Sequence, residues 1–320
     1  MLLRGLFNQT KLIDFFRYST LFLYFSIGGV LISVLLFFSL GLNYGIDFRG
    51  GTMFMISTPS KLEIADIRFS INKASLGDVS ITKTTDPLKN ITGGAVAKEK
   101  NVFLIKVERD DSMNIESIVR KTLSEDIGGV TFLQVDTVGS KISGELVQKG
   151  TLAVVLAVVS VLIYIWLRFE WQFALGAVIA LVHDVVLTIG IFSIFRYEFN
   201  LSIIAALLTI VGYSLNDTVV VFDRVRENLR SYKSKPLIEI LNLSINNTLS
   251  RTIMTSLTTL LALLALFFVG GDVIRGFTFA MIWGVIVGTY SSIFVAAKVL
   301  SILDVKRNWD KQESKAGTQF

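Results

Sequence analysis

Five side chains that could take part in proton chemistry lie within or beside apolar stretches that are long enough to cross a membrane. They are His183, Asp184, Asn216, Asp217 and Arg251. Placing an Asp at the centre of a spanning helix costs roughly 2.5–3.5 kcal/mol, so such a residue usually faces protein or water and marks a functional site. The types of these side chains predict proton transfer.

The predicted chemistry centres on Asp217. An apolar environment favours the neutral form of a carboxyl group and a nearby Arg favours the charged form, so an Asp that exchanges between the two can bind a proton from one side and release it to the other. We expect Asp217 to titrate, Arg251 to modulate it, and Asn216, His183 and Asp184 to contribute to the path. The proton would be the coupling ion, and no cofactor is expected.

A structural role for the same residues stays open at this point. Asp217 could make a helix–helix hydrogen bond or a static ion pair with Arg251, and His183 with Asp184 could be a buried polar pair that holds the bundle together. Spacing along the chain does not show which of these side chains meet.

Composition places the chain among polytopic α-helical membrane proteins. Of its 320 residues 52% are hydrophobic, the mean hydropathy is +0.61, and there are 24 Phe but only 3 Pro. The absence of Cys excludes disulfides and thiolate metal sites, and a single His argues against a His-rich metal site. No Walker, dinucleotide or metal motif is present, so we expect no enzyme activity.

Six apolar stretches are predicted to span the membrane, the first as an uncleaved helix. They cover residues 20–42, 151–167, 173–195, 201–222, 252–269 and 277–301. An even number puts both termini on one side. Basic residues near the spans predict that this side is the cytoplasm, because the opposite short loops hold only Arg196 and Arg275. The net charge of +5 is thus explained by orientation in the membrane, and no nucleic-acid partner is expected.

Three segments are expected on the cytoplasmic side. Residues 1–19 suit either a short interfacial helix or a solvated cytoplasmic tail, and 302–320 fit a polar cytoplasmic tail. The loop 223–251 has an apolar stripe that predicts an amphipathic helix on the inner membrane surface. The stripe consists of Leu237, Ile240, Leu241, Ile245 and Leu249.

Residues 43–149 form the only long polar segment and are predicted to fold as an external domain. Strands are expected at 52–57, 78–84, 102–107 and 130–138, and helices at 62–76 and 113–123. The order βαββαβ predicts a ferredoxin-like α+β fold, with both helices on one face of the sheet.

A stripe of small residues predicts close helix packing in the last span, 277–301. Gly284 and Gly288 have the Gly-x-x-x-Gly spacing that lets a second helix approach closely. The stripe does not show whether that helix belongs to this chain or to a partner.

Several motifs resemble the SecF family of SecDF export complexes. They are GIDFRGGT at 45–52, VGSKISGELVQKG at 138–150, HDVVLTIGIF at 183–192, GYSLNDTVVVFDRVREN at 212–228, and SRTIMTSLTTLLALLALFFVGGDVIRGFTFAM at 250–281. The resemblance covers nearly the whole chain.

The resemblance implies half of a resistance-nodulation-division transporter that pairs with SecD in the bacterial inner membrane, with residues 43–149 in the periplasm. It implies use of the proton motive force in late steps of Sec-dependent translocation, beside the SecYEG channel and SecA. YajC, YidC, the translocating polypeptide and membrane lipids are further expected partners. Asp217 and Arg251 correspond to the family's proton-pathway pair. The motif expected to couple the external domain to polypeptide movement comprises Gly45, Asp47, Phe48, Arg49, Gly50 and Gly51.

Two other functions are compatible with the residues. A proton-coupled small-molecule exporter would use the same chemistry, but one external domain of about a hundred residues is small for a multidomain drug funnel. A scaffold that stabilises a translocase would need no proton coupling at all.

Overall fold

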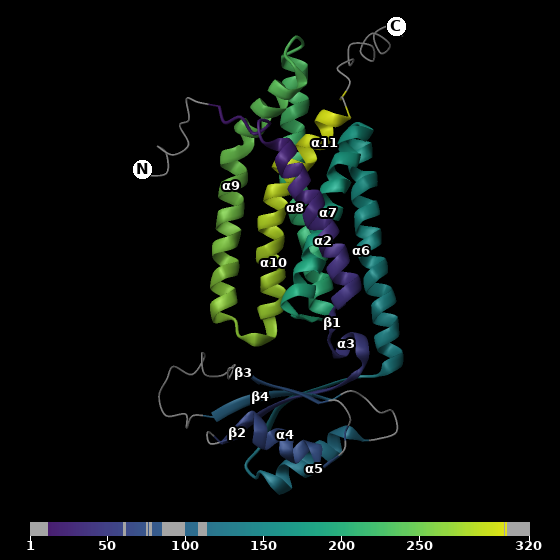
Figure 1. The fold of residues 1–320 in the computed structure, drawn as a ribbon, viewed down its shortest axis with the longest axis vertical. Helices are drawn as coiled ribbons and strands as arrows, with labels where there is room; N and C mark the ends of the chain where they lie inside the picture. The colour runs from purple at the N-terminus through teal and green to yellow at the C-terminus, as the bar shows by residue number, and fades with distance from the viewer. Residues whose placement is uncertain are drawn as a thin grey trace, which may run out of the picture.

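The protein consists of a helical bundle with a small sheet domain at one end (Figure 1). The computed structural model describes residues 12–59, 62–74, 76, 79–84, 100–107, 114–303 and 305. Within them, six helices are long and apolar enough to cross a membrane. The predicted polytopic membrane fold with one α+β domain is confirmed.

The spanning helices lie close to the predicted ranges. They are α2 (Ser19–Leu40), α6 (Ser140–Arg168), α7 (Trp171–Phe195), α8 (Leu201–Ser231), α9 (Leu237–Val269) and α10 (Asp272–Ser291), the last continued by η1 (Ser292–Ala296) and α11 (Ala297–Ile302). The most apolar stretches of α7, α8 and the α10–α11 segment bury 50%, 44% and 56% of their residues, whereas those of α2, α6 and α9 bury 11%. Helices α7, α8 and α10 therefore form the centre of the bundle.

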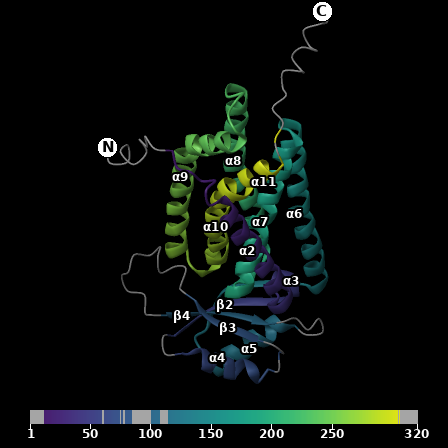
Figure 2. The same cartoon turned by 45° about the horizontal axis from the view of Figure 1, so that its top comes forward.

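The external domain has the predicted order and topology. It contains β2 (Gly51–Pro59), α4 (Ile64–Asn72), β3 (Val79–Thr84), β4 (Lys100–Val107), α5 (Ile115–Asp126) and β5 (Thr131–Val138). The antiparallel sheet has the strand order β3-β4-β2-β5, which is the ferredoxin-like arrangement. Both helices cover the face of the sheet that points away from the bundle (Figures 1 and 2), over a core that includes Phe54, Phe103 and Val119.

Two boundaries differ from the predicted ones. The external domain ends at Val138 rather than at residue 149, because α6 begins at Ser140 and is helical through the polar stretch before the membrane span. The predicted amphipathic helix is the first part of α9, which runs without interruption into the fifth span. Polar residues alone do not end a helix, whereas Gly and Pro often do, and α9 contains neither in its interior.

The apolar stripe of α9 packs on the bundle. Ile240, Leu241 and Ile245 are buried in a cluster with Val225 and Leu229 of α8, and Figure 2 shows this part of α9 lying across the end of the bundle opposite the sheet. Contact with protein therefore covers the stripe that was expected to lie on the membrane surface.

The described part of the N-terminal segment is not helical before α2. It lies along α9, where Asn246 Oδ1 accepts a 2.9 Å hydrogen bond from Ile13 N and Asn242 Oδ1 accepts one of 2.9 Å from Phe15 N. The predicted interfacial helix within 1–19 thus has no counterpart in residues 12–18. Residues 1–11, the loop 85–99 and the tail 306–320 lie outside the described residues.

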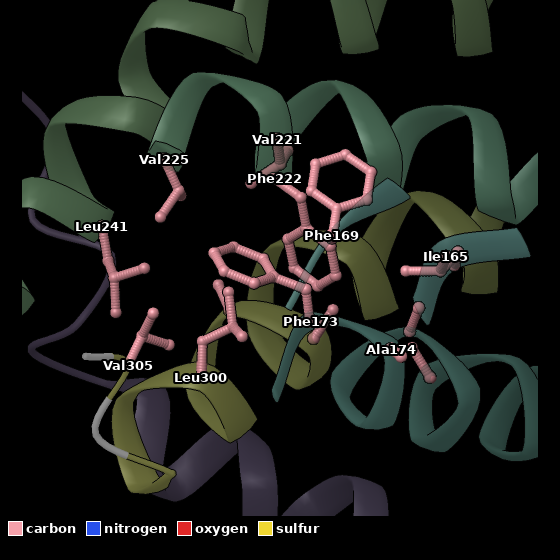
Figure 3. Packing of buried hydrophobic residues seen from close by; sticks show 14 of the residues in the cluster. Ile165, Phe169, Phe173, Ala174, Val221, Phe222, Val225, Leu241, Leu300 and Val305 are labelled. Carbon is pink, nitrogen blue, oxygen red and sulfur yellow. The ribbon is translucent and has the colours of Figure 1, made fainter. Parts of the chain in front are cut away.

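A phenylalanine-rich core closes the end of the bundle away from the sheet (Figure 3). Phe173 of α7 and Phe222 of α8 meet edge to face with ring centroids 5.2 Å apart, and Phe169 joins them from the α6–α7 connection. Leu300 of α11 packs in the same cluster. This core holds α7, α8 and the end of the last span together just beyond the buried polar residues.

Candidate functional site

Helix α8 presents Asp217 on its buried face. Buried residues recur along this helix at intervals of three and four, including Ile210, Ser214, Asp217 and Val221. The residue is 3% exposed, its Oδ2 atom is buried, and no residue in the described part of the chain donates a hydrogen bond to that atom. Buried polar atoms are normally hydrogen-bonded, so an unpartnered carboxylate oxygen points to a function other than packing.

Arg251 lies on the exposed side of α9. Its charge acts on the Asp217 carboxylate. Among the described residues, however, no ion pair joins the two side chains. The static ion pair that the sequence left open is therefore not formed, and Arg251 acts on Asp217 at longer range.

Asn216 does not share the environment of its neighbour Asp217. It is exposed on the outer face of α8, together with Thr209 and Gly212. The structure thus separates two residues that adjoin in sequence, because successive residues of a helix point about 100° apart.

Asp184 lies where three central helices meet. It is fully buried, and its Oδ2 atom accepts hydrogen bonds from Ser214 Oγ of α8 at 2.6 Å and from Ser291 Oγ of α10 at 2.8 Å. Its Oδ1 atom lies 2.9 Å from Nδ1 of the adjacent His183. The predicted pairing of His183 with Asp184 is therefore present, and it is part of a larger polar node that joins α7, α8 and α10.

His183 contacts a second polar group through its ring. The imidazole stacks on Tyr290 of α10 with centroids 6.2 Å apart, and Tyr290 Oη donates a 2.8 Å hydrogen bond to the Phe22 carbonyl of α2. An ionised Asp184 only accepts hydrogen bonds, so we assign Nδ1 as the donor, which leaves Nε2 of a neutral His183 as an acceptor. Nε2 is buried and has no hydrogen-bond partner among the described residues.

Sequence reasoning missed Ser214 and Ser291. Serines in spanning helices usually bond to the carbonyl of the preceding turn, so their presence alone carries little information. The usable signal was the position of Ser214 three residues before Asp217, which places both side chains on one helix face.

The small-residue stripe of α10 packs against α8 of the same chain. A Cβ atom at Gly288 would lie 3.0 Å from Ser214 Cβ, and one at Gly284 would collide with the Ile210 side chain. The close approach of these helices lets α10 and α8 both reach Asp184. The helix that packs against the stripe therefore belongs to this chain.

The predicted coupling motif forms the connection between the bundle and the sheet. Strand β1 (Asn43–Tyr44) directly precedes the motif and pairs in parallel with β6 (Glu198–Phe199) between α7 and α8. The motif itself contains the short helix α3 (Ile46–Arg49). Gly50 and Gly51 have φ values of 79° and 139°, which glycine adopts readily and other residues rarely do.

Two motif residues bond directly to β6 and to the start of α8, which follows it. Asp47 Oδ2 accepts a 2.9 Å hydrogen bond from Leu201 N, and Gly45 N donates one of 2.9 Å to the Phe199 carbonyl. Phe48 packs on Phe199 with ring centroids 5.9 Å apart. The motif therefore attaches the first strand of the external domain to the helix that carries Asp217.

An ion pair adds a second attachment between the domain and the bundle. Lys106 of β4 pairs with Glu198 of β6, and both line a cavity of about 220 Å³ together with Arg49. Burial lowers the pKa of Lys106 from 10.5 to about 8, and the charge of Asp47 opposes this change.

Comparison with known families gives two matches along the chain. The family described as protein export membrane protein SecD/SecF, C-terminal, matches residues 118–306, and the SecD/SecF GG motif matches residues 35–55, which contain the coupling motif.

Individual proteins match over almost the full length. The chain is 47% identical to the protein translocase subunit SecF of Cereibacter sphaeroides, covering 96% of this chain and 94% of that one, and 40% identical to SecF of Rickettsia bellii, covering 92% and 94%. Among solved structures, SecDF from Thermus thermophilus, described as a translocon-associated membrane protein, is similar with a TM-score of 0.79 and 34% identity. That match covers 92% of this chain but 39% of the SecDF chain.

Proposed function

Because the chain belongs to the SecF family of protein translocase subunits, we propose that it pairs with SecD and uses the proton motive force to assist late steps of Sec-dependent protein export. One observation carries the proton-driven part of this proposal. Asp217 lies in the centre of a spanning bundle, 3% exposed, with one carboxylate oxygen that no described residue satisfies. A scaffold would be expected to satisfy such a group or to lack it.

The energy available from proton movement suits this role. Moving one charge through 100 mV supplies about 2.3 kcal/mol. That shifts the population ratio of two domain orientations roughly 50-fold, because each 1.4 kcal/mol is a factor of ten. It is small compared with the free energy of unfolding of a typical domain, about 5–15 kcal/mol. The expected substrate is therefore an unfolded polypeptide, and the chain would catalyse no covalent reaction.

The outer face of α8 supports a membrane partner. Thr209, Gly212 and Asn216 are exposed at intervals of three and four on a helix that spans the membrane. Polar side chains in spanning helices normally face protein, and small residues allow close helix packing. We place SecD against this face, where it would also cover the exposed side of α9 that carries Arg251.

The arrangement of the chain supports the proposed orientation. Helix α2 begins and α11 ends at the end of the bundle opposite the sheet domain (Figure 1). The basic residues Arg168, Arg224 and Arg230 lie at that same end, which the positive-inside rule assigns to the cytoplasm. The sheet domain would then lie in the periplasm of an inner-membrane protein, beside SecYEG and SecA and accessible to YajC, YidC and the polypeptide.

Export from energised membrane vesicles tests the proposal. Asp217→Asn keeps the size of the side chain but cannot release a proton, so it should abolish the part of export that an uncoupler abolishes. Asp223 is an exposed carboxylate six residues further along α8 that accepts a 3.4 Å hydrogen bond from Arg168. Asp223→Asn is therefore the matched control and should leave the uncoupler-sensitive part of export intact.

A further inference from the structure

Two buried atoms without partners lie at the two ends of a series of buried polar groups. They are Asp217 Oδ2 on α8 and His183 Nε2 on α7, each without a hydrogen bond in the described part of the chain. Ser214, Asp184 and the Nδ1 atom of His183 connect them through bonds of 2.6 Å and 2.9 Å. Only the step from Asp217 to Ser214 is not a direct hydrogen bond.

That step spans a single helical turn. Ser214 precedes Asp217 by three residues, and both side chains are buried on the face of α8 that packs on the other helices. Side chains at this spacing have Cβ atoms about 5–6 Å apart, a separation that a hydroxyl and a carboxyl group bridge directly or through one water.

The hydroxyl of Ser214 has the capacity to relay a proton. It donates to Asp184 Oδ2, and a serine oxygen can accept a hydrogen bond while it donates one. Several buried hydroxyls of the bundle bond only to their own helix, as Thr188 does to the Asp184 carbonyl at 2.8 Å and Ser193 does to the Ile189 carbonyl at 3.2 Å. Ser214, like Ser291, instead bonds across to Asp184 of α7, and Asp217 lies one helical turn further along its own helix.

Building on the proposed proton-driven function, we propose that Ser214 relays a proton between Asp217 and Asp184, and that Ser291 positions Asp184 for this transfer. In one step, the carboxyl proton of Asp217 passes to Ser214 Oγ while the hydroxyl proton of Ser214 passes to Asp184 Oδ2. Asp217 becomes a carboxylate, Asp184 becomes a carboxylic acid, and Ser214 stays neutral. Rotation of the hydroxyl then restores its starting orientation.

Ser291 fixes the receiving carboxyl group from the third helix. Its Oγ lies 2.8 Å from Asp184 Oδ2, and the π-helical turn η1 begins at the next residue. Turns of this kind are frequent at functional sites, because they change the direction of side chains along a helix. Within the described part of the chain, titratable or charged groups near the path include His183 on α7, Tyr290 on α10 and Arg251 on α9.

Proton entry into liposomes tests the relay. The complex of this chain with SecD is reconstituted, a membrane potential is imposed, and a trapped pH-sensitive dye reports the rate. Proton-transfer groups typically contribute 10²–10⁴-fold, and water can partly replace a hydroxyl, so we expect Ser214→Ala to slow proton entry by at least about tenfold. Asp184→Asn retains a side-chain oxygen for both serines but no exchangeable carboxyl proton, and should be as slow as Asp217→Asn.

Two serines provide controls with equal burial. Ser193→Ala and Ser292→Ala remove buried hydroxyls that donate to backbone carbonyls of their own helices. Both variants should conduct within about twofold of the wild type, since neither removes a group of the proposed relay. Ser214→Thr retains the hydroxyl and should also conduct. Co-purification with SecD and the Tm of the complex show that each variant is assembled.

The outcomes separate the relay from the proposed function. If Asp217→Asn blocks proton entry while assembled Ser214→Ala or Asp184→Asn conducts like the wild type, the relay is wrong and the proposed function stands. If Ser214→Thr assembles with SecD, keeps the Tm of the wild type and is nevertheless as slow as Ser214→Ala, the loss does not follow the hydroxyl and the relay is again wrong. If Asp217→Asn itself conducts like the wild type, both proposals fall.

Discussion

Asp47 Oδ2 accepts a 2.9 Å hydrogen bond from the backbone N–H of Leu201, so the motif that follows the first spanning helix caps the helix that carries Asp217. The N–H groups of the first turn of a helix have no partner within the helix, and a side-chain acceptor supplies one. This carboxylate therefore joins the segment that leads into the external domain directly to the start of α8.

Removing this acceptor should loosen the start of α8. We expect Asp47→Ala to cost about 1 kcal/mol of local stability, the usual effect of losing a capping side chain. Amide hydrogen exchange at residues 201–203 should rise correspondingly, whereas Asp47→Asn, which retains an acceptor oxygen, should stay close to the wild type. Unchanged exchange in Asp47→Ala would show that the bond contributes nothing to the position of α8.

The contact between α8 and α10 should not tolerate a methyl group at Gly288. The added Cβ would lie 3.0 Å from Ser214 Cβ, and overpacking of this kind costs typically about 1–3 kcal/mol. Gly288→Ala should therefore lower the Tm of the complex. Gly28→Ala on α2 has nothing within 4 Å of its added Cβ and serves as the control, with a Tm equal to or above that of the wild type. Equal Tm values for wild type and Gly288→Ala would contradict the packing described.

Lys106 should lose its proton at an unusually low pH for a lysine. Its pKa is lowered to about 8, with burial as the main cause. The neutral amine is the reactive form, so acylation of Lys106 followed by mass spectrometry should be half-maximal near pH 8, below the ordinary lysine value of 10.5. A Lys106 profile identical to that of the amine of a free lysine peptide would be the contrary result.

The same change in pKa sets the sign of a pH effect on stability. Between about pH 8 and the unfolded value of 10.5, the folded chain binds fewer protons at Lys106 than the unfolded chain does. The contribution of this group to the free energy of unfolding therefore rises with pH across that window and is constant below it.

The proposed SecD-facing surface can be mapped by disulfide cross-linking from single introduced cysteines, because the chain has no Cys of its own. Asn216→Cys should form disulfides with single cysteines placed along the spanning helices of SecD, since this position is exposed on the outer face of α8. Leu156 lies on α6, outside the proposed surface, and is 53% exposed; Leu156→Cys should not form such disulfides. Cross-linking from Leu156→Cys alone would place SecD against α6 instead.

The helices and the sheet were predictable because their signals are local. The apolar runs around Asp217 and His183 are longer than any soluble core helix requires, and the alternating patterns of the external domain fit six short elements. The full lengths of α6 and α9 were harder to predict. Both helices include a polar stretch before the apolar run that hydropathy detects.

The arrangement of the site was only partly accessible from the sequence. Asp217 and Asp184 stood out because charge is costly inside a membrane, whereas Ser214 and Ser291 acquire their role from the crossing of three helices. The pairing of β1 with β6 involves two residues on each strand, which is too short for any periodic signal. The separation of Arg251 from Asp217 likewise depends on how α8 and α9 pack.

The most direct test of the central claim is the release of a secreted protein from energised vesicles that contain SecYEG, SecA, SecD and this chain. Wild type, Asp217→Asn and Asp223→Asn are compared at equal amounts of assembled complex, each with and without an uncoupler. We predict that the uncoupler lowers wild-type and Asp223→Asn release to the level of Asp217→Asn, which itself does not respond. Release from Asp217→Asn that equals the wild type and is equally sensitive to the uncoupler would contradict a titrating role for Asp217.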